Sequence, residues 1–267
     1  MHVKSYILIF LVSFFVYSCE RVIDVDLNEA NQAMVIEGNL NNEKGELEVS
    51  ISKTASFFGN DEMEKISNAK VVFKHHTEEL IKINETSPGV YINDHIQSRP
   101  GNMYELIVEL NGEKYTAESF LNEPVSIDSV AYSYYNGNGF FDGGYRVKLY
   151  FSDPPEADNF YRIKVYKNSE LQNDVNDLIV FDDSAIKGKT IEVTLRGQSF
   201  ADGDKATVEL ITLDENAYEY FSTLRDLVNT NPGSPAPANP ISNFSNGVLG
   251  YFSAWSNDSK DILIEKR

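Results

Sequence analysis

The stretch YELIVELNGEKYTAES, residues 104–119, decides the fold class of this chain. Strand-forming residues alternate with polar residues on both sides of Asn111-Gly112. An Asn-Gly pair between two alternating runs is the strongest short-range indication of a β-hairpin. The stretch therefore predicts two antiparallel strands joined by a tight turn.

Short runs of the same kind, separated by turn residues, occupy most of the chain from Ala33 onward. The segment 33–122 has the spacing of a small β-sandwich of the immunoglobulin or transthyretin-like kind. Proline at 124 ends this part, and residues 125–267 are expected to form a second β domain. There, Asp202-Gly203 between two strand-like runs predicts another tight hairpin. The predicted fold class is mostly β, with two β-sandwich-like domains.

One segment of the second domain, 214–229, predicts a helix. Its apolar residues Ala217, Phe221, Leu224 and Val228 recur at spacings of four, three and four. Asp214 can cap the first turn, and the proline that follows Asn231 ends the helix soon afterwards.

A proline-rich loop, NPGSPAPANPISNFSNGVLGYF at 231–252, follows this helix directly. Its four prolines fix φ and remove backbone donors, so the segment resists joining a sheet. One interpretation is a stiff loop that contacts a ligand or partner, and the other is a crossover held down by Ile241 and Phe244. Under the first interpretation, the candidate binding residues are Asn239, Asn243, Phe244 and Asn246.

The amino terminus, MHVKSYILIFLVSFFVYSCER, has a basic start and an apolar run too short to cross a bilayer. This pattern predicts a signal peptide at 1–18. Cys19, the only cysteine in the chain, follows a small residue, as lipoprotein processing requires. We expect lipidation of Cys19 and a polar tether at 19–32, so that the protein is held on a membrane by its lipid.

The charge balance limits the possible partners. The formal net charge is −18, with 41 acidic against 23 basic residues. Such a surface repels nucleic acid and anionic lipid headgroups, both of which recruit basic patches. Nucleic-acid binding is therefore excluded.

Two end motifs carry a family resemblance. The Ser-Cys-Glu lipobox followed by VIDVDLNEANQAMVIEGNL, together with the late NPISNFSNGVLGYFSAWS, resembles the DUF4249 family of uncharacterised Bacteroidota envelope lipoproteins. Members of that family are often encoded beside TonB-dependent outer-membrane transporters. The resemblance spans essentially the whole mature chain. It implies an outer-membrane accessory lipoprotein and supplies no catalytic or binding residues.

Catalytic motifs are scarce in this sequence. No serine lies in a Gly-x-Ser-x-Gly elbow. His75-His76 lie at the end of a predicted strand, where successive side chains point to opposite faces, so the two rings are expected to diverge. The dense carboxylate clusters are Asp153, Glu156 and Asp158; Asp182 and Asp183; and Asp202 and Asp204.

Each carboxylate cluster sits at a predicted turn, where Asp is favoured for its own backbone hydrogen bonds. Two alternatives to this structural role are a weak calcium site and a carboxylate-based glycan hydrolase. No other cofactor is expected.

The segment VAYSYYNGNGFFDGGYRVKLYF carries the most suggestive aromatic residues. Tyr134, Tyr135, Phe140 and Phe141 flank a Gly/Asn-rich loop that cannot bury all of them locally. Clustered loop aromatics often mark a partner or sugar-binding surface. The alternative is a hairpin whose aromatics fold back on the sandwich.

Together these features predict a lipid-anchored protein of the outer membrane without catalytic activity. It is expected to act as a ligand-binding or partner subunit of a TonB-dependent transporter, on either face of the membrane. The alternatives are a carboxylate-based glycan hydrolase and a surface adhesin or structural lipoprotein.

Overall fold

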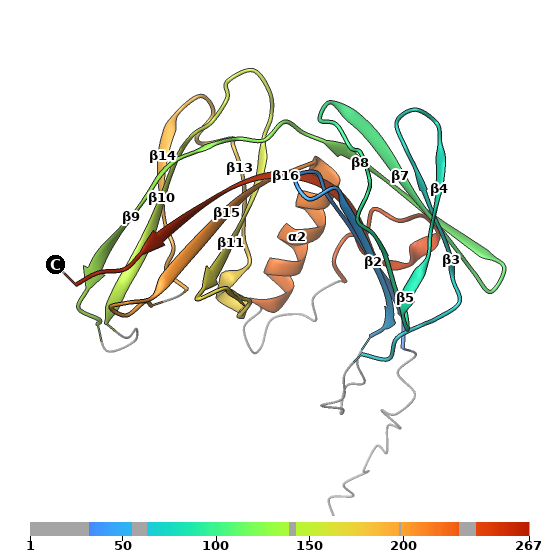
Figure 1. The fold of residues 1–267 in the computed structure, drawn as a ribbon, viewed down its shortest axis with the longest axis horizontal. Coiled ribbons are helices and arrows are strands. Elements are labelled where there is room, and N and C mark those ends of the chain that lie inside the picture. Colours follow the sequence, from blue (N-terminus) through green and yellow to red (C-terminus); the bar gives the residue numbers. More distant parts are fainter. Residues whose placement is uncertain (1–31, 55–62, 139–142, 198, 230–238, 267) are drawn as a thin grey trace, which may run out of the picture.

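The computed structural model describes residues 32–54, 63–138, 143–197, 199–229 and 239–266 (Figure 1). Its regular structure is mostly β, and the described residues contain one α-helix, α2 (Glu215–Val228), and two short 3-10 turns, η3 (Val175–Asp177) and η4 (Ser245–Gly247). The strands are β1 (Met34–Asn41), β2 (Glu46–Lys53), β3 (Lys70–Lys74), β4 (Leu80–Ile83), β5 (Glu85–Ser87), β6 (Val90–Asn93), β7 (Asn102–Leu110), β8 (Glu113–Leu121), β9 (Ile127–Tyr135), β10 (Gly144–Ser152), β11 (Phe160–Lys167), β12 (Glu170–Gln172), β13 (Ile179–Asp182), β14 (Thr190–Thr194), β15 (Lys205–Leu213) and β16 (Leu249–Leu263).

Two β-sandwiches share one large sheet, so the predicted fold class is confirmed. A nine-stranded sheet has the order β12-β11-β15-β16-β1-β2-β6-β5, and β13 also pairs with β11. The four-stranded sheet β4-β3-β7-β8 covers one part of it, and the three-stranded sheet β14-β10-β9 covers the other. The first sandwich is the one that contains the four-stranded sheet, and the second is the one that contains the three-stranded sheet. Alternating residues of the facing strands fill a separate apolar core in each, the first core and the second core.

Strand β16 connects the two sandwiches. Residues 249–255 pair in parallel with β1, and residues 256–263 pair antiparallel with β15. Figure 1 shows β16, in dark red, running from one sandwich to the other. Phe252 and Ala254 of this strand pack into the same core as β1, β2 and β7. The predicted sandwich of 33–122 therefore receives a strand from near the end of the chain.

Helix α2 packs between the two sandwiches, on the face of the shared sheet opposite the second core (Figure 1). Its N-cap Asp214 accepts a hydrogen bond from the Ala217 N–H at 2.7 Å, as the sequence predicted. The same carboxylate accepts from the Phe120 N–H at 2.8 Å and from the Ser119 hydroxyl, both on β8. The cap thus joins the helix to the first sandwich.

The Asn-Gly hairpin is confirmed, because β7 and β8 pair antiparallel around Asn111 and Gly112, which both have positive φ. The second predicted hairpin is wrong. A turn does occur at Gly203, but β14 pairs with β10 and β15 pairs with β11 and β16, in different sheets. Turn residues identify a reversal of the chain, and they do not identify the partner of the strand that follows it.

We expect Gly250→Ala to lower the free energy of unfolding by more than about 2 kcal/mol, because a positive φ of 105° and a backbone overlap act together. Gly250 faces Ile36 in the parallel pair, and an added Cβ would overlap the Ile36 carbonyl oxygen. The matched control is Gly203→Ala, where φ is also positive and no atom lies within 4 Å. Urea denaturation measures both variants. Equal losses would contradict the close approach of β16 to β1.

Candidate functional site

Two of the four predicted loop aromatics lie within the described residues. Tyr134 and Tyr135 end strand β9, whereas Phe140 and Phe141 fall outside the described part of the chain. The Tyr134 ring meets the Tyr145 ring edge-on at 5.1 Å, yet Tyr134 stays 61 % exposed. Tyr135 is on the other side of the strand, where its ring lies 3.9 Å from the Arg146 guanidinium carbon. The side chains of Tyr134 and Tyr135 therefore point to opposite faces of β9.

A hollow of about 430 Å³ opens beside Tyr135 on the outer face of the β14-β10-β9 sheet. Strand register brings its walls together, since Arg146 pairs with Ser133 and Lys148 pairs with Thr194. The lining residues are Ser133, Tyr134, Tyr135, Asn138, Arg146, Thr194 and Arg196.

The chemistry of this hollow is cationic, aromatic and polar at once. Two arginines, Arg146 and Arg196, line this hollow in a chain whose net charge is −18. A guanidinium can donate two parallel hydrogen bonds to a carboxylate, and a tyrosine ring offers a flat apolar face. The hollow can therefore hold a polar ligand that carries a carboxylate.

Charges next to the hollow are already paired. Lys148 forms an ion pair with Glu192 at 2.8 Å, and the Tyr150 hydroxyl donates to the same carboxylate. These hydrogen bonds lower the pKa of Glu192, with that from Lys148 contributing most. The charge of Lys148 is thus already compensated by Glu192.

Sequence reasoning missed the two arginines. Alternation in GYRVKLYF puts Arg146 on the wet face of its strand, and this could have placed it beside Tyr135. Nothing in the sequence indicates that Arg196 comes next to them, because that depends on the pairing of β14 with β10.

The candidate residues of the proline-rich loop are bound into the fold, with the exception of Asn239. Residues 231–238 lie outside the described part, and Asn239 is exposed. The Asn243 side chain donates to the Phe252 carbonyl at 2.8 Å and accepts from the Phe252 N–H at 2.9 Å. Phe244 is buried in the first core, and Asn246 has a φ of 58° and donates to the Lys114 carbonyl at 2.7 Å. From Asn243 onward this geometry is that of a crossover pinned by Phe244, whereas Ile241 is 48 % exposed.

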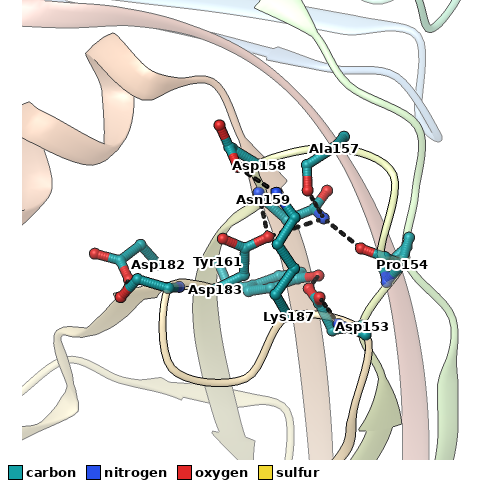
Figure 2. Close-up of polar contacts among 11 residues, drawn as sticks. Asp153, Pro154, Ala157, Asp158, Asn159, Tyr161, Asp182, Asp183 and Lys187 are labelled. Carbon is teal, nitrogen blue, oxygen red and sulfur yellow. Dashed lines mark hydrogen bonds and ion pairs between the residues drawn. The ribbon is translucent and has the colours of Figure 1, made fainter.

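Asp153 and Asp183, one from each of two predicted carboxylate clusters, join the loop between β10 and β11 to the loop between β13 and β14 by hydrogen bonds (Figure 2). Asp153 is buried, and it accepts from the Tyr161 hydroxyl and from the Gly188 N–H at 2.8 Å. Asp183 is also buried and accepts from the Asn159 N–H at 2.9 Å. Burial, followed by the hydrogen bond to Asp153, raises the pKa of Tyr161, so it remains a donor. Both carboxylates are satisfied by the fold.

The histidine pair differs from its prediction. The ring centroids of His75 and His76 are 4.0 Å apart, so the expectation that they diverge is wrong. Strand β3 ends at Lys74, and strand alternation does not apply in the turn that follows. His75 Nε2 lies 2.7 Å from the Gln97 carbonyl oxygen, and burial lowers the pKa of His76. The pair forms part of a local hydrogen-bonded turn.

Another hollow, of about 460 Å³, lies at the tip of the β7–β8 hairpin. Its wall includes Lys70 and Glu109, which form an exposed ion pair at 3.1 Å. Surface pairs of this kind contribute little, and none of the described residues that line this hollow is aromatic. This hollow offers less for ligand recognition than the one at Tyr135.

Within the described ranges, no group of three or more His, Cys, Asp or Glu side chains is placed to hold a metal ion. Cys19 lies outside those ranges. The described part of the chain also contains no helix with the length and apolar character needed to cross a membrane.

Comparison with known proteins gives a family and distant structural likenesses. Residues 20–261 match the family model described as "Domain of unknown function (DUF4249)". Similar solved structures include the FN1–FN3 domains of chicken CNTN1 (9 % identity, 88 % of this chain and 67 % of that chain, TM-score 0.26). They also include a segment of two fibronectin type-III domains from chicken tenascin (10 % identity, 88 % and 100 %, TM-score 0.24). These TM-scores are too low to carry an argument. A search of curated proteins finds no match.

We expect Tyr161→Phe to cost about 1–3 kcal/mol of stability, because it leaves an oxygen of buried Asp153 without its donor. The matched control is Tyr150→Phe, which removes a hydroxyl from exposed Glu192 and should change stability by less than about 0.5 kcal/mol. Thermal denaturation of both variants measures the difference. If the two variants lost the same stability, the buried cluster would not be holding the two loops together.

Proposed function

The chain belongs to the DUF4249 family, and from that premise we propose that it is a non-catalytic, ligand-binding lipoprotein of the outer membrane. The observation that carries the proposal is the hollow at Tyr135, where two arginines and an aromatic ring line one exposed space. The proposed ligand is a carboxylate-bearing saccharide. The proposed anchor is a lipid on Cys19, and the proposed partner is a TonB-dependent transporter that receives the ligand.

The arrangement of the hollow supports binding rather than turnover. Arg146 lies on the Tyr135 ring, so one guanidinium is already oriented in the wall. Arg196 is exposed two residues beyond the end of β14 and can close on a bound carboxylate. Ser133 and Thr194 supply hydroxyls for the remaining polar groups of a sugar. Among the described residues that line this hollow, none carries a carboxylate to serve as a general acid or base.

The glycan-hydrolase alternative lacks a supporting observation among the described residues. A glycosidase needs two carboxylates facing a cleft, one of them free to give a proton. Asp153 and Asp183 are instead buried and hydrogen-bonded to neighbouring loops. An adhesin role remains the principal competing function, and affinity purification of the partner separates it from transport.

We expect Arg196→Ala to weaken the binding of trigalacturonate by about tenfold or more, the loss expected for a charge-assisted hydrogen-bonding pair. Calorimetric titration of the exported Cys19→Ala chain, which carries no acyl groups, measures this. Methyl-esterified trigalacturonate is the matched ligand without charge and should bind more weakly. Lys148→Ala is the matched variant, since Lys148 is already paired with Glu192, and it should change the affinity much less. Unchanged binding by Arg196→Ala would contradict the assignment of the site.

We expect affinity purification of the tagged, lipid-bearing protein from native membranes to recover a β-barrel transporter. The Cys19→Ala chain is the control and should recover less, because it is not held at the membrane. Mass spectrometry identifies what remains bound. Repeated purification without a transporter, together with binding to matrix polymers, would replace the transport proposal with the adhesin.

A further inference from the structure

A third pocket, of about 270 Å³, lies on the opposite side of the second sandwich from the Tyr135 hollow. It is enclosed by the C-terminal half of α2, the η3 turn and strands β11 and β12. Its lining combines the cations Arg162 and Lys164, the acidic residues Asp174 and Asp177, and apolar side chains of β12, η3 and α2. Its volume is slightly below the usual range of ligand pockets, about 300–1,000 Å³, so it fits a small ligand.

Two cations on β11 line this pocket and rest on aromatic rings. Arg162 and Lys164 alternate with Tyr161, Ile163 and Val165, which fill the second core, so both cations point to the other face of the sheet. The Arg162 guanidinium carbon lies 4.1 Å from the Phe221 ring centroid, and Lys164 Nζ lies 4.8 Å from the Trp255 ring centroid. Among the described residues, neither cation forms an ion pair with a carboxylate.

The charged neighbours leave these cations only partly compensated. Glu209 is directly opposite Lys164 on β15, but it accepts a hydrogen bond from the Tyr166 hydroxyl at 3.2 Å. Lys44 adds a further positive charge near Lys164. At the rim, Asp177 accepts from the Asp174 N–H at 3.0 Å and so closes the η3 turn.

Burial of the two cations has an energetic cost. Burial, followed by the charge of the nearby Arg162, lowers the pKa of Lys164 to about 8. Burial also lowers the pKa of Arg162. Glu209 acts on both cations and offsets part of this cost, and a bound anion would offset more of it.

The rim of the pocket is apolar and open to solvent. Leu171, Val175 and Val228 come from β12, η3 and α2, and they are 39 %, 49 % and 41 % exposed. Leu224 extends this surface toward Arg162. An exposed apolar surface beside convergent polar groups is the usual composition of a ligand site.

We propose that this pocket binds a small amphipathic carboxylate, with its carboxylate on Arg162 and Lys164 and its apolar body against Leu171, Val175 and Val228. Arg162 supplies two parallel donors, and Lys164 supplies a point charge. This pocket is separate from the Tyr135 hollow, and the proposal does not depend on the function proposed for that hollow.

Trp255, the only tryptophan in the chain, provides a direct reporter because Lys164 lies over its ring. The experiment titrates the exported Cys19→Ala chain with octanoate, and with 1-octanol as the neutral probe of matched length, and records Trp255 fluorescence. We expect a saturable change with octanoate and a weaker one with 1-octanol. Affinity for octanoate should fall as the pH rises through about 8, because Lys164 loses its proton there.

Three variants test the residues themselves. Lys164→Met should weaken octanoate binding by about tenfold or more, and Leu171→Glu, an exposed change that adds a repelling charge, should weaken it comparably. Lys148→Met removes an equal charge on the far face of the sandwich and should leave binding unchanged.

The proposal is overturned by any of three results. The first is the absence of a saturable Trp255 response to octanoate. The second is an equal response to 1-octanol that Lys164→Met does not alter, which would indicate apolar partitioning only. The third is an equal loss in Lys148→Met, which would indicate a general effect of net charge.

Discussion

The double pairing of strand β16 is the constraint on which the rest of the structure depends. One half of the strand completes the sheet of the first sandwich beside β1, and the other half completes the second beside β15. Buried backbone N–H and C=O groups must be hydrogen-bonded, so neither part of the shared sheet is complete without this strand. Ser119 of β8 accepts from the Ala254 N–H of β16 and donates to Asp214 at the start of α2. The two sandwiches and the helix are thereby made one cooperative unit.

The same strand creates the surface between the sandwiches. Its side chains alternate, so that Phe252 enters the first core while Tyr251 and Trp255 face the helix. The aromatic face formed with Phe221 accommodates Arg162 and Lys164, which the apolar core behind β11 could not. The proposed carboxylate pocket thus follows from the route of β16, whereas the Tyr135 hollow follows from the separate pairing of β9, β10 and β14.

Local structure could be predicted from the sequence because its causes are local. The Asn111-Gly112 turn and the Asp214 cap each depend on a few consecutive residues. The parallel pairing of β1 with β16 joins residues more than 200 positions apart, and no short pattern encodes it. Tyr135 is a candidate from the sequence because it belongs to a short aromatic segment. Arg196, Arg162 and Lys164 are not, because strand pairing between distant segments places them in their pockets. The histidine prediction failed because β3 ends one residue before His75.

Native-state hydrogen exchange in increasing urea tests the integration of the molecule through β16 most directly. The amides to compare are those of β7, in the first sandwich, and those of β10, in the second. If β16 makes one cooperative unit, both sets should open with the same free energy and the same dependence on urea. If β10 opened well before β7, or the reverse, the sandwiches would be independent domains, and the integrating role of β16 would be contradicted.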